Sequence, residues 1–242
     1  MAEIITRKEA LERLKKDEIR NINMMNFINN YQVDDLLAIG DAILARGVSD
    51  RPWVYLSARD EWELNALIPL LNAKDRSFAV AEPWMVPYLT QGRRLLWDMP
   101  IMKLYLPKSV SLPPLTITNG LTKLEPSDAT HVYENSDYQE FLTIDYVEER
   151  IKNGTHACYR KDGHLVAWAM THDDGAIGFL HVMPEERKNG YGMTVTVALV
   201  HTLREKGALP FVHIEEKNSK SMNLAKKLGF VEDRIITWFS VK

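Results

Sequence analysis

The chain has 242 residues, of which 45% are hydrophobic and 26% charged, and its 12 glycines and 11 prolines complete an ordinary globular composition. This composition excludes collagen-like, low-complexity and wholly disordered proteins. The length allows one large domain or two small ones. A net charge of −3 gives the molecule no overall basic field with which to hold nucleic acid or an anionic membrane.

Cysteine usage and hydropathy indicate a protein without anchors or disulfides. The single cysteine, Cys158, excludes an intrachain disulfide and any cysteine-based zinc site. The charged N-terminus contains no apolar stretch of signal-peptide length, and no run approaches the roughly 20 apolar residues of a membrane-spanning helix. We therefore expect a cytoplasmic protein that needs no metal and binds neither membrane nor nucleic acid.

The first half of the chain is expected to be a mixed α/β domain. Leu, Ile and Ala recur at helical spacing in several segments, and Gly47 is a natural helix stop. The expected elements are helices over 7–20, 33–46 and 60–71, and strands over 52–57 and 77–81. This half contains no histidine, and we find no nucleophile, metal cluster or phosphate-binding motif in it.

A proline-rich connector separates the two halves. Three prolines fall within residues 105–120, and proline is excluded from helix interiors and from central strands. We therefore divide the chain into two domains, residues 1–114 and residues 115–242. All 7 histidines lie in the second domain, which places the titratable chemistry there.

The second half has a clear alternation of strands and helices. Asp162-Gly163 is a strong hairpin signal, and Asn153-Gly154 a helix stop. The expected order is a strand over 116–124, a helix from 125, a helix over 138–152, three antiparallel strands over 156–160, 164–171 and 176–183, a helix to 206, a strand over 211–215, a helix over 219–228 and a strand over 235–241.

One motif in this half carries chemistry. Residues 187–192 read Arg-Lys-Asn-Gly-Tyr-Gly and lie between an expected strand and a long helix. A helix that starts there leaves several backbone N–H groups without intrahelical partners, at the positive end of its dipole. Gly190 and Gly192 let an anion approach the backbone closely, and Arg187 and Lys188 add positive charge. The motif favours a pyrophosphate site; the plainer alternative is a glycine-rich turn with solvated charges.

The motif and its surroundings resemble the GNAT N-acetyltransferases. Residues 180–192 are similar to the family's acyl-CoA signature, in which a strand ending in Val is followed by R/Q-x-x-G-x-G/A. Asn218 and Ser221, with Leu-Gly-Phe at 228–230, resemble its second motif, and residues 121–129 its opening strand and helix. The match covers residues 116–242 in order. The sequence Asp-Gly-Ala-Ile-Gly at 174–178 and the divergent first half look most like the glycine N-acyltransferase-like branch.

The resemblance implies an α+β fold, with a mostly antiparallel central sheet flanked by helices and a divergent α/β N-terminal half. It also implies an acyl-CoA-dependent N-acyltransferase that uses acetyl-CoA or another acyl-CoA. The acceptor would be a small-molecule amine or an amino acid that attacks the thioester directly in a ternary complex. The residues implied to bind the cosubstrate are Val182, Arg187, Lys188, Asn189, Gly190, Tyr191, Gly192, Met193, Asn218 and Ser221.

The sequence departs from the family at both usual proton carriers. Ala225 stands seven residues after Asn218, where many members have a Tyr acid, and Ala176 stands where many have a Glu or His base. His181 and Glu215 are the candidate replacements. Strand alternation places His181 on the face opposite Ala176, and a β-bulge between them would reverse this.

Without a usual carrier, we expect no side chain to be indispensable. His181→Ala, His213→Ala and Glu215→Gln should each lower turnover by less than about a hundredfold, whereas a well-placed base contributes typically 10²–10⁴-fold. Two other functions stay open. One is a catalytically inactive acyl-CoA-binding module, and the other is a protein N-acetyltransferase.

Overall fold

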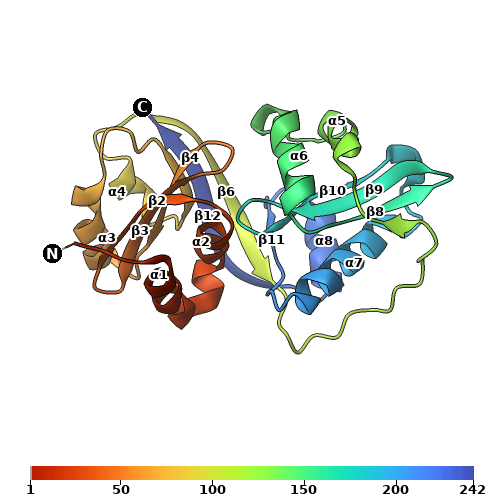
Figure 1. Ribbon diagram of the computed structural model, residues 1–242, viewed down its shortest axis with the longest axis horizontal. Coiled ribbons are helices and arrows are strands. Elements are labelled where there is room, and N and C mark those ends of the chain that lie inside the picture. Colours follow the sequence, from red (N-terminus) through yellow and green to blue (C-terminus); the bar gives the residue numbers. More distant parts are fainter. Residues whose placement is uncertain (1) are drawn as a thin grey trace. The chain divides into compact units, whose positions relative to one another are not determined.

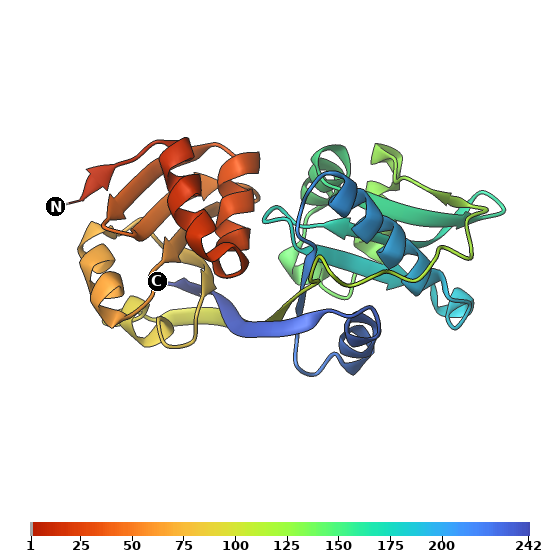
Figure 2. The same ribbon diagram turned by 90° about the horizontal axis from the view of Figure 1, so that it is seen from below.

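The computed structural model describes residues 2–242, which form two compact units. The first unit contains the chain up to residue 103 together with residues 214–217 and 232–242. The second contains residues 104–213 and 218–231. Figures 1 and 2 show the blue C-terminal strand running into the unit that holds the red N-terminal elements. The division predicted after residue 114 stays a prediction.

The first unit is a sheet with helices on both faces. Its strands are β1 (Glu3–Ile4), β2 (Val33–Ile39), β3 (Ala42–Val48), β4 (Pro52–Ser57), β5 (Ser77–Ala81), β6 (Leu95–Tyr105) and β12 (Val231–Val241). Its helices are α1 (Arg7–Leu14), α2 (Glu18–Asn30), α3 (Glu61–Leu67) and α4 (Val86–Leu89). The strands lie in the order β1-β2-β3-β4-β5-β12-β6. The pair β4–β5 is parallel, and β1–β2, β2–β3, β3–β4 and β5–β12 are antiparallel.

The strand alternation of β3 sorts its residues between two cores. Ile43 and Ala45 pack with residues of α1 and α2 on one face. Leu44 packs on the other face with Leu64 and Leu67 of α3. Successive side chains of a strand point to opposite faces, so a sheet covered on both faces has continuous apolar strands.

That continuity explains why the helix predicted over residues 33–46 is wrong. These residues form the antiparallel hairpin of β2 and β3, in which Ile39 pairs with Ala42. The two residues between them, Gly40 and Asp41, make the turn, and Gly40 has a φ of +60°. A continuous apolar run does not distinguish a buried strand from a helix, whereas Gly-Asp is a hairpin signal.

The second unit has a five-stranded sheet. Its strands are β7 (Leu121–Thr122), β8 (His156–Lys161), β9 (His164–Thr171), β10 (Ile177–Val182) and β11 (Phe211–Ile214), and its helices α5 (Ala129–Glu134), α6 (Ile144–Asn153), α7 (Tyr191–Glu205) and α8 (Ser219–Lys227). The strand order is β7-β8-β9-β10-β11, antiparallel except for the parallel pair β10–β11. The expected mixed α/β architecture, with a mostly antiparallel sheet flanked by helices, is confirmed.

Helices cover both faces of this second sheet. Val132 of α5 and Val147 of α6 pack with Trp168 and Met170 of β9. The long helix α7 packs on the opposite face, as Figure 2 shows. The strand predicted over 116–124 is limited to β7, and the helix predicted from residue 138 begins at Ile144 in α6.

The connector between β6 and β7 follows α7 without forming a helix or strand over residues 106–120. Arg204 of α7 donates from Nη1 to the Val110 carbonyl at 2.8 Å and from Nη2 to the Pro107 carbonyl at 3.0 Å. These two bonds fix the connector to the helix. Within residues 2–242, no helix is long and apolar enough to cross a membrane.

Candidate functional site

The turn from β10 into α7 carries the predicted anion-binding motif. β10 ends at Val182, and α7 begins at Tyr191. Gly190 precedes the helix with a φ of +84°, and no side chain within residues 2–242 caps this end. The N–H of Thr194 donates to the Gly190 carbonyl at 3.0 Å, so the N–H groups of residues 191–193 lie ahead of the first helical bond.

The glycines of this turn are tightly placed. A Cβ on Gly192 would lie 3.3 Å from Cγ2 of Val182, and a Cβ on Gly190 would lie 3.3 Å from Cδ1 of Ile117. Both separations are closer than ordinary packing, so neither position has room for a larger side chain on that side. The exposed backbone of the turn is therefore accessible to an anion because the residues are glycines.

The charges around the turn suit an anion. Arg187 and Lys188 are exposed, and the first turn of α7 contains no acidic residue. Lys188 has a φ of +69°, an uncommon conformation for a residue with a Cβ. Arg187 donates from Nε to the carbonyl of Val182 at 3.1 Å. The residues of this turn therefore fit a pyrophosphate, although the Val182 carbonyl already has a hydrogen-bond donor within the protein.

The residues of the second motif lie at another helix N-terminus. Asn218 precedes α8, and its Oδ1 accepts a hydrogen bond from the N–H of Ser221 at 3.1 Å. An Asn at this position stabilises a helix by capping it, which accounts for Asn218 without a ligand.

Tyr191 stacks on Tyr159 of β8, with ring centroids 4.3 Å apart. The ring of Tyr191 is thus held in place by packing within the second unit.

A β-bulge in β10 changes which side chains share a face. Gly178 pairs with Met170, but His181 pairs with Trp168, so β10 has one residue more than β9 between these pairs. Phe179 lies within the bulge and has a φ of +51°. His181 therefore points to the same face as Gly178, and hence as Ala176. Simple alternation placed His181 on the wrong face, and the bulge that we considered as the alternative is present.

His181 lies in an apolar setting on the face that α5 and α6 cover. Its ring stacks on Trp168, with centroids 4.9 Å apart and an angle of 20° between the rings. Burial lowers the pKa of His181 below its usual value, and the charges of Arg187 and His131 lower it further, while Asp137 raises it. Nε2 of His181 is buried and has no hydrogen-bond partner among the described residues. A neutral imidazole of this kind can accept a proton.

A second histidine contacts Trp168 on the same face of the sheet. His131 of α5 contacts Trp168 edge-on, with centroids 5.5 Å apart. Its Nε2 is also buried without a hydrogen-bond partner in the part of the chain that the structure describes. Unpaired buried polar atoms are uncommon and call for an explanation. We missed His131 and Trp168 at the sequence level, because only the folded sheet brings α5 and β9 together.

The usual proton-carrier positions hold no titratable group. Ala225 is buried in α8, and Ala176 is buried ahead of β10. The N–H of Ala176 donates to Oδ1 of Asp174 at 3.0 Å, and Oδ2 of Asp174 lies 3.9 Å from Nδ1 of His213. A buried carboxylate and imidazole therefore lie near position 176, although the residue there is alanine.

Glu215 and Cys158 have settings unlike that of His181. Glu215 belongs to residues 214–217 of the first unit and pairs with Nζ of Lys217 at 2.7 Å. The structure therefore does not assemble Glu215 and His181 within one unit. Cys158 is buried, and burial raises its pKa to about 12, so it carries no reactive thiolate near neutral pH. Residues 2–242 contain no group of three or more His, Cys, Asp or Glu that could hold a metal ion.

The fold described above is that of the GNAT acetyltransferases. Residues 157–239, about a third of the chain, match the family model described as FR47-like protein. That match includes β10, the glycine turn, α7 and the second motif. No curated protein sequence gives a significant match to the chain.

Several solved structures share the fold at low sequence identity. A Drosophila protein is 14% identical with a TM-score of 0.80, covering 100% of this chain and 98% of its own. A tandem GNAT protein from the clavulanic acid biosynthesis pathway is 13% identical with a TM-score of 0.57, and the match covers 100% of this chain and 98% of that protein. A GNAT-family acetyltransferase from Colwellia psychrerythraea is 12% identical with a TM-score of 0.55, covering 100% of both chains.

Proposed function

We propose that the chain is a cytoplasmic, metal-independent N-acyltransferase that transfers an acyl group, acetyl first among them, from CoA to the amine of a small molecule or amino acid. The observation that carries this proposal is the glycine-lined, uncapped N-terminus of α7, at the end of the turn that follows the bulged strand β10. The FR47-like match over residues 157–239 and the GNAT-like fold support it. A place in the glycine N-acyltransferase-like branch is part of the same proposal.

The residues of the turn would bind the pyrophosphate of the cosubstrate. In this assignment the backbone of residues 188–193 donates hydrogen bonds, and the exposed Arg187 supplies positive charge. Val182 would contact the pantetheine arm, and Asn218 and Ser221 would lie on the other side of the cosubstrate. Bound acyl-CoA supplies a thioester whose thiolate is a good leaving group.

His181 is the residue that we assign to proton transfer. An amine attacks a thioester only when it is neutral, so a group that takes its proton speeds the reaction. The bulge places His181 on the α5–α6 face, and its lowered pKa keeps the ring neutral near pH 7. Its unpartnered Nε2 would accept the proton from the amine. Glu215 remains a second candidate, acting through water.

A turnover assay with free-thiol detection tests the proposal. Acetyl-CoA and longer acyl-CoAs are offered with a panel of amines, amino acids and lysine-containing peptides. We expect thiol release that depends on a small amine or amino acid. Release with the peptides alone would favour a protein N-acetyltransferase. Tight CoA binding with no thiol release on any acceptor would favour an inactive acyl-CoA-binding module, the alternative that Ala176 and Ala225 support.

A further inference from the structure

The two units are built from the same sequence of elements. The first runs β1, α1, α2, β2, β3, β4, α3, β5 and α4. The second runs β7, α5, α6, β8, β9, β10, α7, β11 and α8. In each, a short strand and two helices precede three strands, a helix, a parallel strand and a further helix. Nothing in the sequence of the first half showed this repeat.

The strand pairing repeats as well. The order β1-β2-β3-β4-β5 corresponds to β7-β8-β9-β10-β11. In both series the first three pairs are antiparallel and the last pair is parallel. The first unit therefore has the connectivity of the acyltransferase fold. In that connectivity the turn from β4 into α3 corresponds to the glycine turn from β10 into α7.

The turn of the first unit is closed by its own carboxylates. Asp60 caps α3, with Oδ1 accepting from the N–H of Glu63 at 2.9 Å. Glu63 is buried and accepts from the N–H of Arg59 at 2.7 Å through Oε2. Its other oxygen, Oε1, accepts from Nε of Arg59 at 2.8 Å. Two carboxylates thus occupy the helix terminus where, in the second unit, glycines leave the backbone open. A bound pyrophosphate there would meet like charge.

The first unit also lacks the bulge. β4 pairs with β3 from Ser57↔Ile43 to Pro52↔Val48 in constant register, whereas β10 shifts its register against β9 between Gly178 and His181. The pairing of β4 with β5 extends over Val54 and Tyr55. The strand that corresponds to β10 therefore stays regular.

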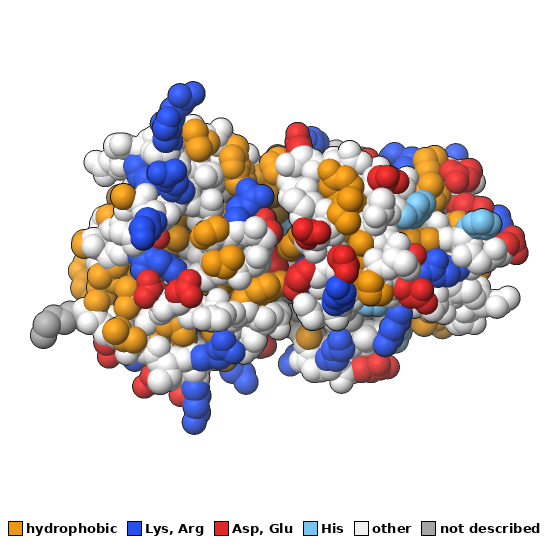
Figure 3. Space-filling view, turned by 45° about the horizontal axis from the view of Figure 1, so that its top comes forward, with side chains coloured by type: hydrophobic (Ala, Val, Ile, Leu, Met, Phe, Trp, Pro, Cys, Tyr) orange, Lys and Arg blue, Asp and Glu red, His pale blue; other side chains and the backbone are white. Residues whose placement is uncertain are grey.

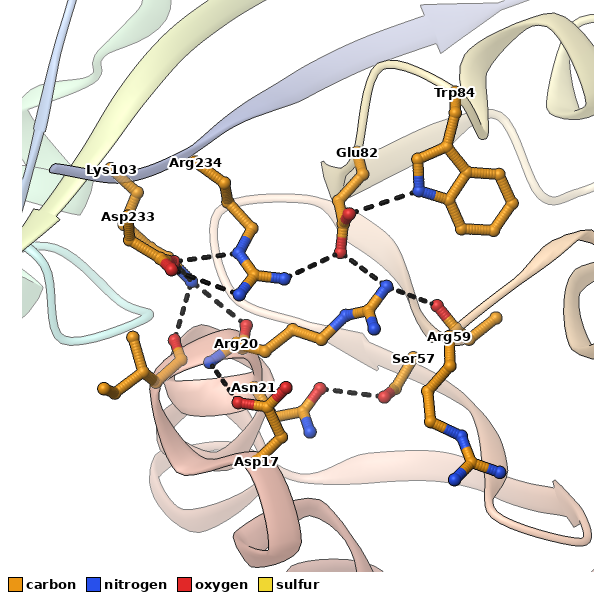
Figure 4. A network of polar contacts seen from close by, with 12 residues as sticks. Asp17, Arg20, Asn21, Ser57, Arg59, Glu82, Trp84, Lys103, Asp233 and Arg234 are labelled. Atoms are coloured by element: carbon orange, nitrogen blue, oxygen red, sulfur yellow. Dashed lines mark hydrogen bonds and ion pairs between the residues drawn. The ribbon is translucent and has the colours of Figure 1, made fainter.

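An ion-pair network fills the end of the strand pair β4–β5 (Figure 4). Arg20 of α2 donates from Nη2 to the carbonyl of Ala58, directly after β4, at 2.6 Å. The same nitrogen lies 2.6 Å from Oε1 of Glu82, directly after β5. Arg20 therefore joins the two strand ends. In the second unit, Val182 at the corresponding end of β10 is proposed to contact the pantetheine arm. The side chains of Arg20 and Glu82 are only 13% and 18% exposed.

The network continues into β12 and β6. Arg234 lies 3.2 Å from Glu82 and donates to both oxygens of Asp233, and Asp233 lies 3.1 Å from Nζ of the buried Lys103. Lys103 also donates to the carbonyls of Ile19 and Arg20. Removing one partner of such a buried pair is costly, so these charges are fixed in place. Arg20, Glu82 and Arg234 line a cavity at this place. Its volume is about 20 Å³, room for about one water molecule.

We propose that the first unit is a second copy of the acyltransferase fold that cannot accept acyl-CoA, so that each chain binds a single acyl-CoA, at the α7 turn. This inference rests on the proposed function for the location of the one site. In this inference the carboxylates of Asp60 and Glu63 and the Arg20–Glu82 pair exclude the ligand from the first unit.

Binding stoichiometry tests the proposal on the full chain. Isothermal titration with CoA should give one site per chain. Gly192→Asp places a carboxylate in the first turn of α7, as Asp60 and Glu63 do at the start of α3. It should weaken CoA binding at least tenfold. Gly92→Asp is the matched control, because it adds the same carboxylate at a turn of the first unit that has room for it and aspartate tolerates the left-handed backbone there; we expect one site of unchanged affinity. Circular dichroism checks that both variants are folded.

Hydrogen exchange locates the site independently. CoA should protect backbone amides within residues 187–193 and leave those of residues 58–63 unchanged. Two CoA molecules per chain would overturn the inference and leave the proposed function intact. Protection at residues 58–63 with Gly192→Asp still binding would overturn both, because the α7 turn would then not be the site. A wild-type chain that binds no CoA would overturn the proposed function, and the single site with it.

Discussion

Gly192 is the residue at which cosubstrate binding is most easily removed. A Cβ at position 192, in the first turn of α7, would lie 3.3 Å from Cγ2 of Val182, so a branched side chain has no room on that side. Gly192→Val should weaken CoA binding at least tenfold, about 1.4 kcal/mol, as measured by calorimetry. Ala73→Val, at an exposed position of the first unit, should leave the affinity unchanged. Equal affinities for both variants would remove the pyrophosphate assignment.

His181 should contribute to turnover without being indispensable. We expect His181→Ala to lower turnover by less than about a hundredfold and to leave CoA affinity unchanged, because a thiolate leaves readily and orientation carries much of the rate. The pH profile above about 6.5 should follow the ionisation of the amine, since His181 is neutral there. The exposed His164 is the control. A thousandfold loss with intact CoA affinity would make His181 an essential base.

Two half-buried histidines make stability depend on pH. Burial lowers the pKa of His156 and of His181 below the usual 6.5. Nδ1 of His156 also accepts a hydrogen bond from the N–H of Leu124 at 3.1 Å, which requires the unprotonated atom. As the pH falls below about 6.5, the unfolded chain binds these protons first, so the free energy of unfolding decreases. Above that pH both states are neutral and the histidines contribute no slope.

Urea denaturation at pH 7.5 and pH 5.5 measures this effect. His156→Gln should lose less stability between these two pH values than the unchanged chain. His164→Gln, at an exposed histidine, should show the full loss. An identical loss for both variants would mean that the buried imidazole is not the source.

Only some residues of the candidate site could be predicted from the sequence, and each case has a physical reason. Gly190 and Gly192 could be assigned because a backbone anion site depends on local chain order. The orientation of His181 depends on a bulge at Phe179, a non-glycine residue with positive φ that no turn signal marks. His131 approaches Trp168 only through packing of α5 on the sheet.

At the scale of elements, β12 lies at the end of the chain but belongs to the first unit, and the second unit begins at residue 104, within β6. A fragment of the second unit should therefore leave β12 out and include residues 104–114. Phe239 of β12 is fully buried against Phe78 of β5, with ring centroids 4.9 Å apart. A fragment of residues 115–242 therefore carries an apolar strand without its neighbour. It also lacks the buried Leu104 and Leu106 of the second unit.

We expect a fragment of residues 104–231 to stay monomeric and bind CoA with the affinity of the full chain. The fragment of residues 115–242 should aggregate, because it exposes β12. Size-exclusion chromatography and calorimetry on the two fragments make the comparison. Better behaviour of the 115–242 fragment would show that the division after residue 114 is the correct domain boundary.

The fold of the second unit was more predictable than that of the first. Polar turns such as Asp162-Gly163 separate its strands, and the resemblance supplied their order. In the first unit the sheet is covered on both faces, so β2 and β3 form an apolar run that also fits a helix. The place of β12 in that unit is a long-range pairing, with Thr237 opposite Ala81. Local sequence patterns carry no information about such a partner.

At the scale of the whole molecule, the position of β12 sets an order of events during synthesis. About 125 residues separate the end of β6 from the start of β12. At ribosomal rates of about 5–20 residues per second, this interval lasts roughly 6–25 s. During this interval the edge of β5 that pairs with β12 has no strand beside it. The part of the protein that is made first is therefore completed last, and its nascent form is the one most in need of a chaperone.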